Sequence, residues 1–348
     1  MKLLFICRAS TKIGLGHLTR SRTLAETASW QHEVKFLVIG SEIAKKLLSG
    51  SPFPFHVVAE EKGIPQHVTD RFDAVIIDMM HLEARWLEYL RNKASLLVSI
   101  SPIFDQMAGM DLFFSRTRYG TKNHNLATEK QFRGLKYTII QKACSAIDSR
   151  LFKANLKREN LPVAICMGGG DAANKTLLFL QALRQCRVPA TFWVLIGEGY
   201  THSLDLLIKA IDRDKNHEII LAKTNVSMWH ILNNCVLAIL SGGVTTYEAA
   251  YAGLPTINMF ESDDQFFLIK ELIEAGVSIN AGLMCDKNLT RIDKLIERLY
   301  DNREKLLEMH RSSRHLIDGR GSERILRIIE KKAASGSLRD PGAVTERG

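Results

Sequence analysis

The same arrangement of residues occurs twice in this chain, roughly 150 positions apart. Each copy has a short apolar run, then a glycine-rich turn, then a segment with helical spacing, and the turns lie at Ile13–Arg20 and Gly168–Thr176. Glycine tolerates positive φ and has no Cβ, so such a turn lets backbone N–H groups approach an anionic or polyhydroxyl ligand. Two similar halves that face each other would bring both turns to the rim of one cleft.

The chain is long enough to form two domains, because 348 residues exceed what one hydrophobic core usually supports. A polar, charged run at 148–160 is the candidate boundary. We expect a first domain over 1–150, a linker over 151–160, and a second domain over 161–332 that ends in terminal helices. Residues 333–348 have few apolar side chains and no periodicity, which predicts a mobile tail.

Short apolar runs alternate with amphipathic segments along both halves. This rhythm predicts the α/β class, with parallel sheets covered by helices on both faces. The expected strands are 3–6, 34–39, 55–58, 74–78, 95–100, 112–114, 136–140, 163–167, 191–196, 218–221, 236–240 and 256–260. The expected helices are 20–29, 41–48, 81–91, 177–186, 228–233, 263–275 and two more within 291–332. The polar stretch 116–134 is expected to be an irregular connection.

Composition and charge exclude several classes of protein. With 46% hydrophobic and 24% charged residues, the chain is that of an ordinary soluble globular protein, and its six cysteines lack the C-x-x-C spacing of a zinc site. No apolar run is long enough for a membrane span or a signal peptide, so we expect a cytoplasmic protein with reduced thiols. The net charge of +9 is dispersed and is not interleaved with aromatic residues, so nucleic acid is not an expected partner. A basic surface suits a phosphate-bearing small ligand or loose attachment to anionic lipid.

The first glycine turn carries the candidate base. His17 follows Gly14 and Gly16 near the positive end of a helix dipole, which disfavours the imidazolium and leaves a neutral ring able to accept a proton. A glycine turn with a histidine cap would explain the same residues. Asp78 stands at the carboxyl end of an apolar run, where open α/β sheets hold polar groups for ligands.

A third glycine stretch follows the apolar run 236–240. Gly242, Gly243, Thr245 and Thr246 precede or open a helix whose first turn contains Glu248. Backbone N–H groups and threonine hydroxyls there suit a diphosphate, and a carboxylate one turn further on suits the two hydroxyls of a ribose. Helix capping with an acidic first turn explains these residues equally well.

The order and spacing of these motifs resemble the GT-B superfamily. Within it, the chain most resembles the UDP-sugar hydrolases of pseudaminic acid synthesis and the related spore-coat polysaccharide proteins, over roughly residues 1–280. The motifs that carry the likeness are Gly14–Arg20, Met167–Asp171 with Asn174, Gly242–Glu248 and Gly253–Pro255.

This resemblance implies two Rossmann-like domains with parallel sheets that face an interdomain cleft, and a nucleotide held mainly by the second domain. His17 would be the base that activates water against the anomeric carbon of a UDP-sugar. The residues implied to bind the nucleotide are Gly16, Gly169, Gly170, Asp171, Gly242, Gly243, Thr245, Thr246 and Glu248. Those implied to contact the sugar are Gly14, Asp78, Asp264 and Gln265.

No metal or other cofactor is expected, and Arg20 or Lys223 would supply positive charge for the leaving group. The last helix of GT-B folds often returns to the first domain, which 325–329 would do here.

Two departures from the hydrolases fall in the first domain. Met80 stands where they tend to have tyrosine, and Ser101–Phe104 stands where they tend to have an acidic pair. These residues, with Met79, would furnish an apolar acceptor groove. The sequence therefore predicts a UDP-sugar hydrolase, with a glycosyltransferase as the main alternative and a 2-epimerase or a nucleotide-sugar binder as further ones.

Overall fold

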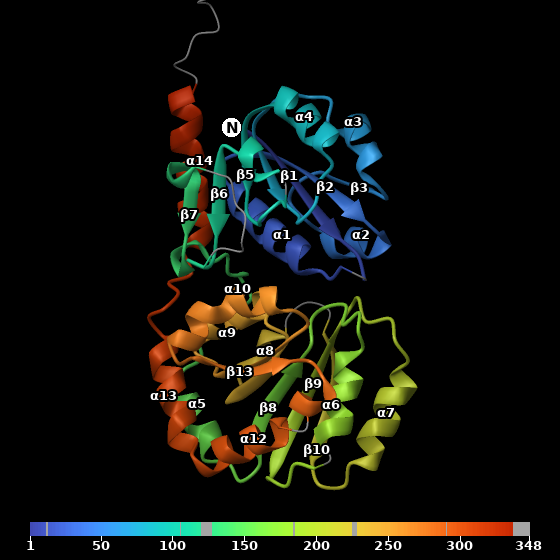
Figure 1. Cartoon of the computed structure of the whole chain (residues 1–348), viewed down its shortest axis with the longest axis vertical. Helices are drawn as coiled ribbons and strands as arrows, with labels where there is room; N and C mark the ends of the chain where they lie inside the picture. The colour runs from blue at the N-terminus through green and yellow to red at the C-terminus, as the bar shows by residue number, and fades with distance from the viewer. Residues whose placement is uncertain are drawn as a thin grey trace, which may run out of the picture.

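The computed structural model describes residues 1–11, 13–104, 106–119, 127–183, 185–224, 228–289 and 291–336. Within these residues two parallel sheets lie one above the other along the long axis of the molecule (Figure 1). The first sheet has the strand order β3-β2-β1-β4-β5-β6-β7, and the second has the order β10-β9-β8-β11-β12-β13. We call the first sheet, with the helices packed on it, the first lobe. The second sheet with its helices is the second lobe.

Apart from β7 and β13, the strands of both lobes form at the apolar runs where strands were expected. Those of the first lobe are β1 (Lys2–Ala9), β2 (Glu33–Gly40), β3 (Phe55–Val58), β4 (Phe72–Asp78), β5 (Ala94–Ser99), β6 (Leu112–Ser115) and β7 (Gln131–Arg133). Those of the second lobe are β8 (Leu161–Cys166), β9 (Ala190–Gly197), β10 (Glu218–Thr224), β11 (Leu237–Leu240), β12 (Thr256–Phe260) and β13 (Ser278–Leu283). Side chains alternate between the two covered faces: on β1, Leu3 and Phe5 join one buried cluster, and Leu4 and Ile6 join another.

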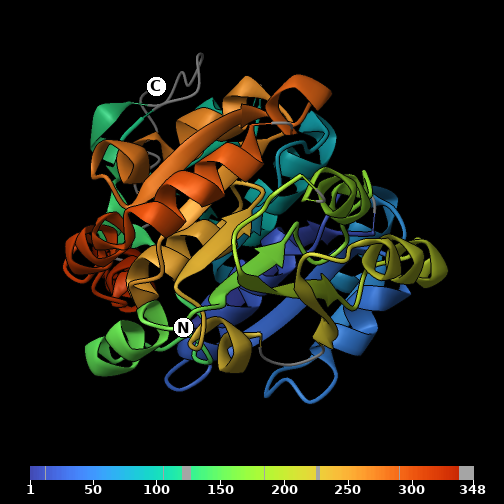
Figure 2. The ribbon, with the colours of Figure 1, turned by 90° about the horizontal axis from the view of Figure 1, so that it is seen from below.

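The helices cover both faces of each sheet, as Figure 2 shows for the second lobe. They are α1 (Gly16–Ala28), α2 (Glu42–Leu48), α3 (Ile64–His67), α4 (Ala84–Lys93), α5 (Ser149–Leu156), α6 (Lys175–Leu183), α7 (Leu204–Arg213), α8 (Trp229–Leu232), α9 (Val244–Ala252), α10 (Asp263–Glu274), α11 (Asp286–Leu289), α12 (Ile292–Asp301), α13 (Arg303–Ser313) and α14 (Gly321–Gly336). None of the helices that the structure describes combines the length and apolarity of a membrane span. All six cysteines are free thiols, and five of them are buried.

The strand order places the glycine turns at functionally favoured points. In the first sheet the order in which strands are added switches from one side of β1 to the other, so that β4 lies next to β1. In the second sheet the same switch places β11 next to β8. Ligands of open α/β sheets bind at the carboxyl ends of strands next to such a switch. The first glycine turn follows β1, the second follows β8 and the third follows β11, so all three lie at these points.

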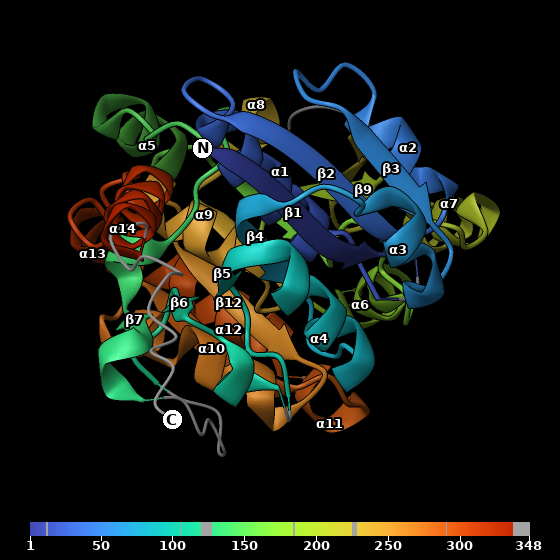
Figure 3. The ribbon, with the colours of Figure 1, turned by 90° about the horizontal axis from the view of Figure 1, so that it is seen from above.

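The chain passes between the lobes twice. The expected linker is mostly helical: α5 covers 149–156, and its Phe152 and Leu156 belong to the core of the second lobe. The last helix, α14, returns to the first lobe, where Ile325 and Ile329 join the core (Figures 1 and 3). The expected tail is helical over 333–336, and 337–348 lie outside the described residues.

Four expectations about elements were wrong. Residues 136–140 are not a strand. The chain leaves the first sheet here through a short 3-10 turn, and the apolar Tyr137 and Ile139 are buried in the core of the first lobe. The stretch 116–134 contains β7, and the second sheet has an additional edge strand, β13, whose Ala281 and Gly282 carry little strand signal. The region 291–336 forms three helices rather than two.

Candidate functional site

A pocket of about 360 Å³ lies between the lobes, and the three glycine stretches line it. The first lobe contributes Ile13–Gly16, and the second contributes 168–171 together with 241 and 243–245. The expectation that both glycine turns meet at one cleft is confirmed.

Close approach of the lobes explains why glycine occupies several of these positions. A Cβ built on Gly169 would lie 3.1 Å from Cδ1 of Leu15, and one on Gly170 would lie 2.9 Å from the carbonyl oxygen of Thr11. A Cβ on Gly16 would lie 3.6 Å from Cγ2 of Val244, an ordinary contact, so space does not require glycine there. Gly14, with φ +95°, has open space around it, so there the backbone conformation is the constraint.

The carboxylate of Asp171 begins α6. Its Oδ1 accepts a hydrogen bond from the backbone N–H of Lys175 at 2.8 Å, and its Oδ2 accepts one from Thr176 at 2.9 Å. The residue lines the pocket but is only 6% exposed, so its carboxylate serves as a helix cap. Its expected contact with the nucleotide stays a prediction. The backbone carbonyl oxygen of Asp171 is also engaged, by the backbone N–H of Asn174 at 2.8 Å and by Nε2 of His202 at 2.9 Å.

In the third glycine stretch, the two threonines point in different directions. Thr245 lines the pocket. Thr246 is 1% exposed, and its hydroxyl donates to Oδ1 of Asn258 at 2.7 Å. The same Oδ1 also accepts a hydrogen bond from the backbone N–H of Gly242 at 3.2 Å. The prediction that the Thr246 side chain binds the nucleotide is wrong, because that hydroxyl is used to hold the turn against β12. Gly242 has φ +74°, and a Cβ there would lie 2.7 Å from the ring of Phe260.

Glu248 lies at the pocket as a buried carboxyl. Both of its oxygens lie 2.9 Å from Nε2 of Gln141, which donates to them. Burial raises the pKa of Glu248 to about 7, against the opposing effect of the Gln141 hydrogen bonds. Gln141 comes from the first passage between the lobes and was missed in the sequence, where nothing marks it.

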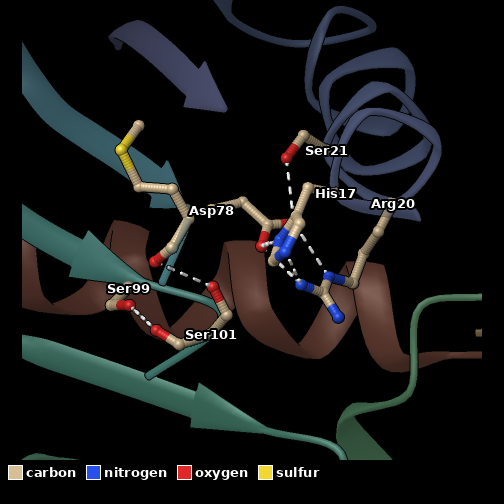
Figure 4. A network of polar contacts seen from close by, with 7 residues as sticks. His17, Arg20, Ser21, Asp78, Ser99 and Ser101 are labelled. Carbon is tan, nitrogen blue, oxygen red and sulfur yellow. Dashed lines mark hydrogen bonds and ion pairs between the residues drawn. The ribbon is translucent and has the colours of Figure 1, made fainter. Parts of the chain in front are cut away.

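His17 belongs to a buried network at the start of α1 (Figure 4). Its Nδ1 lies 2.7 Å from Oδ1 of Asp78, and Arg20 binds both oxygens of that carboxylate, with Nε 2.9 Å from Oδ2. The hydroxyl of Ser21 donates to Oδ2 at 3.1 Å. The His17 side chain is 19% exposed, and its neighbours Gly16 and Thr19 line the pocket. Nδ1 is therefore the ring nitrogen engaged by Asp78, and Nε2 is the other one.

Asp78 is an ionised residue without contact to solvent. Burial acts to raise its pKa, but the Arg20 guanidinium and the contact with His17 outweigh burial and hold the pKa well below its usual range. The prediction that Asp78 binds the sugar is wrong, because the residue is 0% exposed and its oxygens are occupied by protein groups. It orients His17 instead.

The remaining predicted residues have mixed outcomes. Gln265 lines the pocket, and its Oε1 accepts from the backbone N–H of Glu261 at 2.8 Å. The side chain of Asp264 lies outside the described residues. Neither suggested cation is free at the pocket as described, because Arg20 is bound to Asp78 and Lys223 is exposed on β10.

The apolar acceptor groove is not formed as expected. Met79 and Ile103 are 0% exposed and belong to the core beneath the first sheet, whereas Met80 is 45% exposed. The pocket contains a cation that the sequence analysis missed, Lys175. Among the described residues, no group of three His, Cys, Asp or Glu side chains is placed to hold a metal ion.

Comparison with sequences gives distant relatives, and no family model matches the chain. The spore coat polysaccharide biosynthesis protein SpsG of Bacillus subtilis is 21% identical over 335 residues, which are 91% of this chain and 94% of the relative. An uncharacterized protein of Methanocaldococcus jannaschii is 23% identical over 281 residues, or 76% of this chain. This chain spans 57% of the length of that archaeal relative.

Solved structures resemble the whole chain. MurG of Acinetobacter baumannii aligns with a TM-score of 0.66 at 16% identity, covering 95% of this chain and 100% of MurG. A putative UDP-N-acetylglucosamine 2-epimerase of Listeria monocytogenes aligns with 0.63 at 16% identity, covering 96% and 98%. Anabaena HepE in complex with UDP and glucose aligns with 0.61 at 14% identity, covering 97% and 100%. The likeness extends over both lobes, and the fold of this chain is therefore GT-B, as the sequence motifs predict.

Proposed function

We propose that this chain binds a UDP-sugar in the pocket between the lobes and cleaves it at the anomeric carbon with water, releasing UDP and the free sugar. The observation that carries the proposal is the pairing of His17 with the buried, ionised Asp78 at the start of the helix whose first turn lines the pocket. The likeness to HepE, which was crystallised with UDP and glucose, supports the class of ligand.

The geometry suits a general base. As the water oxygen bonds to the anomeric carbon, Nε2 of His17 would take its proton, and the bond from that carbon to the diphosphate oxygen would break. Asp78 would stabilise the imidazolium that forms, and Arg20 holds Asp78 in place. Gly243 and Thr245, at the start of α9, line the pocket where backbone N–H groups favour the departing diphosphate. The reaction consumes water and needs no cofactor.

The relative SpsG supports a role in making a surface polysaccharide, for which the free amino or deoxy sugar would be an intermediate. A glycosyltransferase is the second candidate, because the same base would deprotonate an acceptor hydroxyl as readily as water. The exposed Met80 favours that candidate, since it offers an apolar contact beyond the carboxyl end of β4.

Release of UDP from a panel of UDP-sugars without any acceptor tests the proposal. We expect steady release by the wild-type chain and a loss of about 10²-fold or more in His17→Ala, the scale of a lost general base. His315→Ala, which changes an exposed histidine beyond α13, serves as the matched control. No release without acceptor, but release with one, would favour the transferase; near-normal turnover in His17→Ala would exclude the base role.

A further inference from the structure

Lys175 is a buried cation on the surface of the pocket. It is the first residue of α6 and lies five positions after Gly170, the last glycine of the second turn, yet it is only 6% exposed. Its Nζ lies 2.5 Å from Oε1 of Glu261, which follows β12 and lines the same pocket.

The ion pair is asymmetric in its exposure. The side chain of Lys175 is 7% exposed, whereas that of Glu261 is 47% exposed. Leaving a buried ammonium without a counter-ion is costly, but a half-exposed carboxylate can turn into water at little cost. In this pair the anion is therefore the exchangeable partner, and the cation stays in the pocket.

A diphosphate is well suited to take the place of Glu261. It carries more negative charge than one carboxylate and offers several oxygens, so the ammonium would stay paired with an anion when the carboxylate leaves. The carboxylate of Asp171 at the same helix start does not compete, because its oxygens accept from backbone N–H groups of α6.

We propose that Lys175 binds the diphosphate of the nucleotide and that Glu261 is a displaceable counter-ion, which pairs with Lys175 again when the product leaves. The inference rests on the proposed function, since it assigns the diphosphate contact of that same site. Glu261 then has two effects: it neutralises the charge of Lys175 while the pocket is empty, and it competes with bound UDP, which speeds release.

Calorimetric titration of the full chain with UDP, and ligand-observed NMR with uridine, test both residues. We expect Lys175→Met to weaken UDP binding by about 10- to 100-fold, the size of a lost charge-assisted hydrogen bond, and to leave uridine binding unchanged. Lys175→Arg should retain most of the affinity for UDP. Glu261→Gln should tighten UDP binding several-fold, mainly through slower dissociation. Lys305→Met, which removes a cation from an exposed ion pair on α13, is the matched control.

The outcomes separate this inference from the proposed function. A wild-type chain that binds no UDP would overturn both. Two results would overturn the inference alone, provided that the wild-type chain binds UDP. One is a UDP affinity of Lys175→Met within twofold of the wild-type affinity. The other is a loss of uridine affinity in Lys175→Met as large as its loss of UDP affinity. Weaker UDP binding by Glu261→Gln would overturn the role of the counter-ion. Melting temperatures measured without ligand show whether each variant is folded.

Discussion

Replacing Asp78 with asparagine tests the network at His17 most directly. Asp78 is 0% exposed and Arg20 is 9% exposed, so Asp78→Asn leaves a buried guanidinium without its counter-ion. Removing one partner of a buried ion pair usually costs about 3–5 kcal/mol of unfolding free energy. The amide would also fail to stabilise an imidazolium at His17, and we expect turnover to fall by about 10²–10⁴-fold.

A second substitution separates the two effects. In Arg20→Gln/Asp78→Asn, two neutral amides face each other, so we expect most of the lost stability to return while turnover stays low. Urea unfolding gives the stability, and release of UDP gives the turnover. Recovery of turnover in the double variant would refute the reasoning, because it would show that Asp78 acts only through folding.

The pH dependence supplies an independent check on Asp78. Its pKa in the folded chain lies below the unfolded value of about 4, so its ionised form stabilises the fold above that pH. This contribution is lost as the pH falls further, towards the folded pKa. The stability difference between wild type and Asp78→Asn should therefore be constant above about pH 4 and shrink below it. A difference that stays constant into stronger acid would contradict the assignment.

Three further substitutions test other parts of the description. The pKa of Glu248 is raised to about 7, which means that the folded chain binds this proton more tightly than the unfolded chain. The stability of the wild type should therefore fall as the pH rises from about 4.5 to 7. Glu248→Gln should remove this slope and be more stable than wild type at pH 8, by up to about 3 kcal/mol in urea unfolding. Gly197→Ala would place a Cβ 2.5 Å from the carbonyl oxygen of Gly169, so it should lower the melting temperature and weaken UDP binding together, and unchanged binding would contradict the close packing of these turns. Phe152 is 0% exposed and its ring lies 4.1 Å from that of His310, so Phe152→Ala should cost about 3–5 kcal/mol, whereas a residue in a loose linker would cost almost nothing.

The sequence was sufficient for features that depend on local patterns. Apolar runs bounded by glycine located the central strands, and the repeated order of strand, glycine turn and helix indicated two sheets with a shared cleft. The pocket lined by Gly14, Gly169 and Gly243 follows from that order, because the carboxyl ends of parallel strands meet at one edge of a sheet.

Features that depend on partners far along the chain were not predictable in this way. Thr245 and Thr246 are equivalent in sequence, and only Asn258, on the next strand, decides which hydroxyl turns away from the pocket. Asp78 is oriented by Arg20, which lies 58 positions earlier, so a polar residue at the end of a strand was taken for a ligand of the sugar. These misses come from side chains whose direction is set by tertiary contacts.

The return of α14 to the first lobe has a consequence for how the chain folds as it is synthesised. Ile325, Leu326 and Ile329 fill part of a core whose strands end about 190 residues earlier. Until these residues leave the ribosome, the lobe made first keeps part of its apolar interior open to water. Its folding is therefore expected to finish only after the lobe made second has been synthesised.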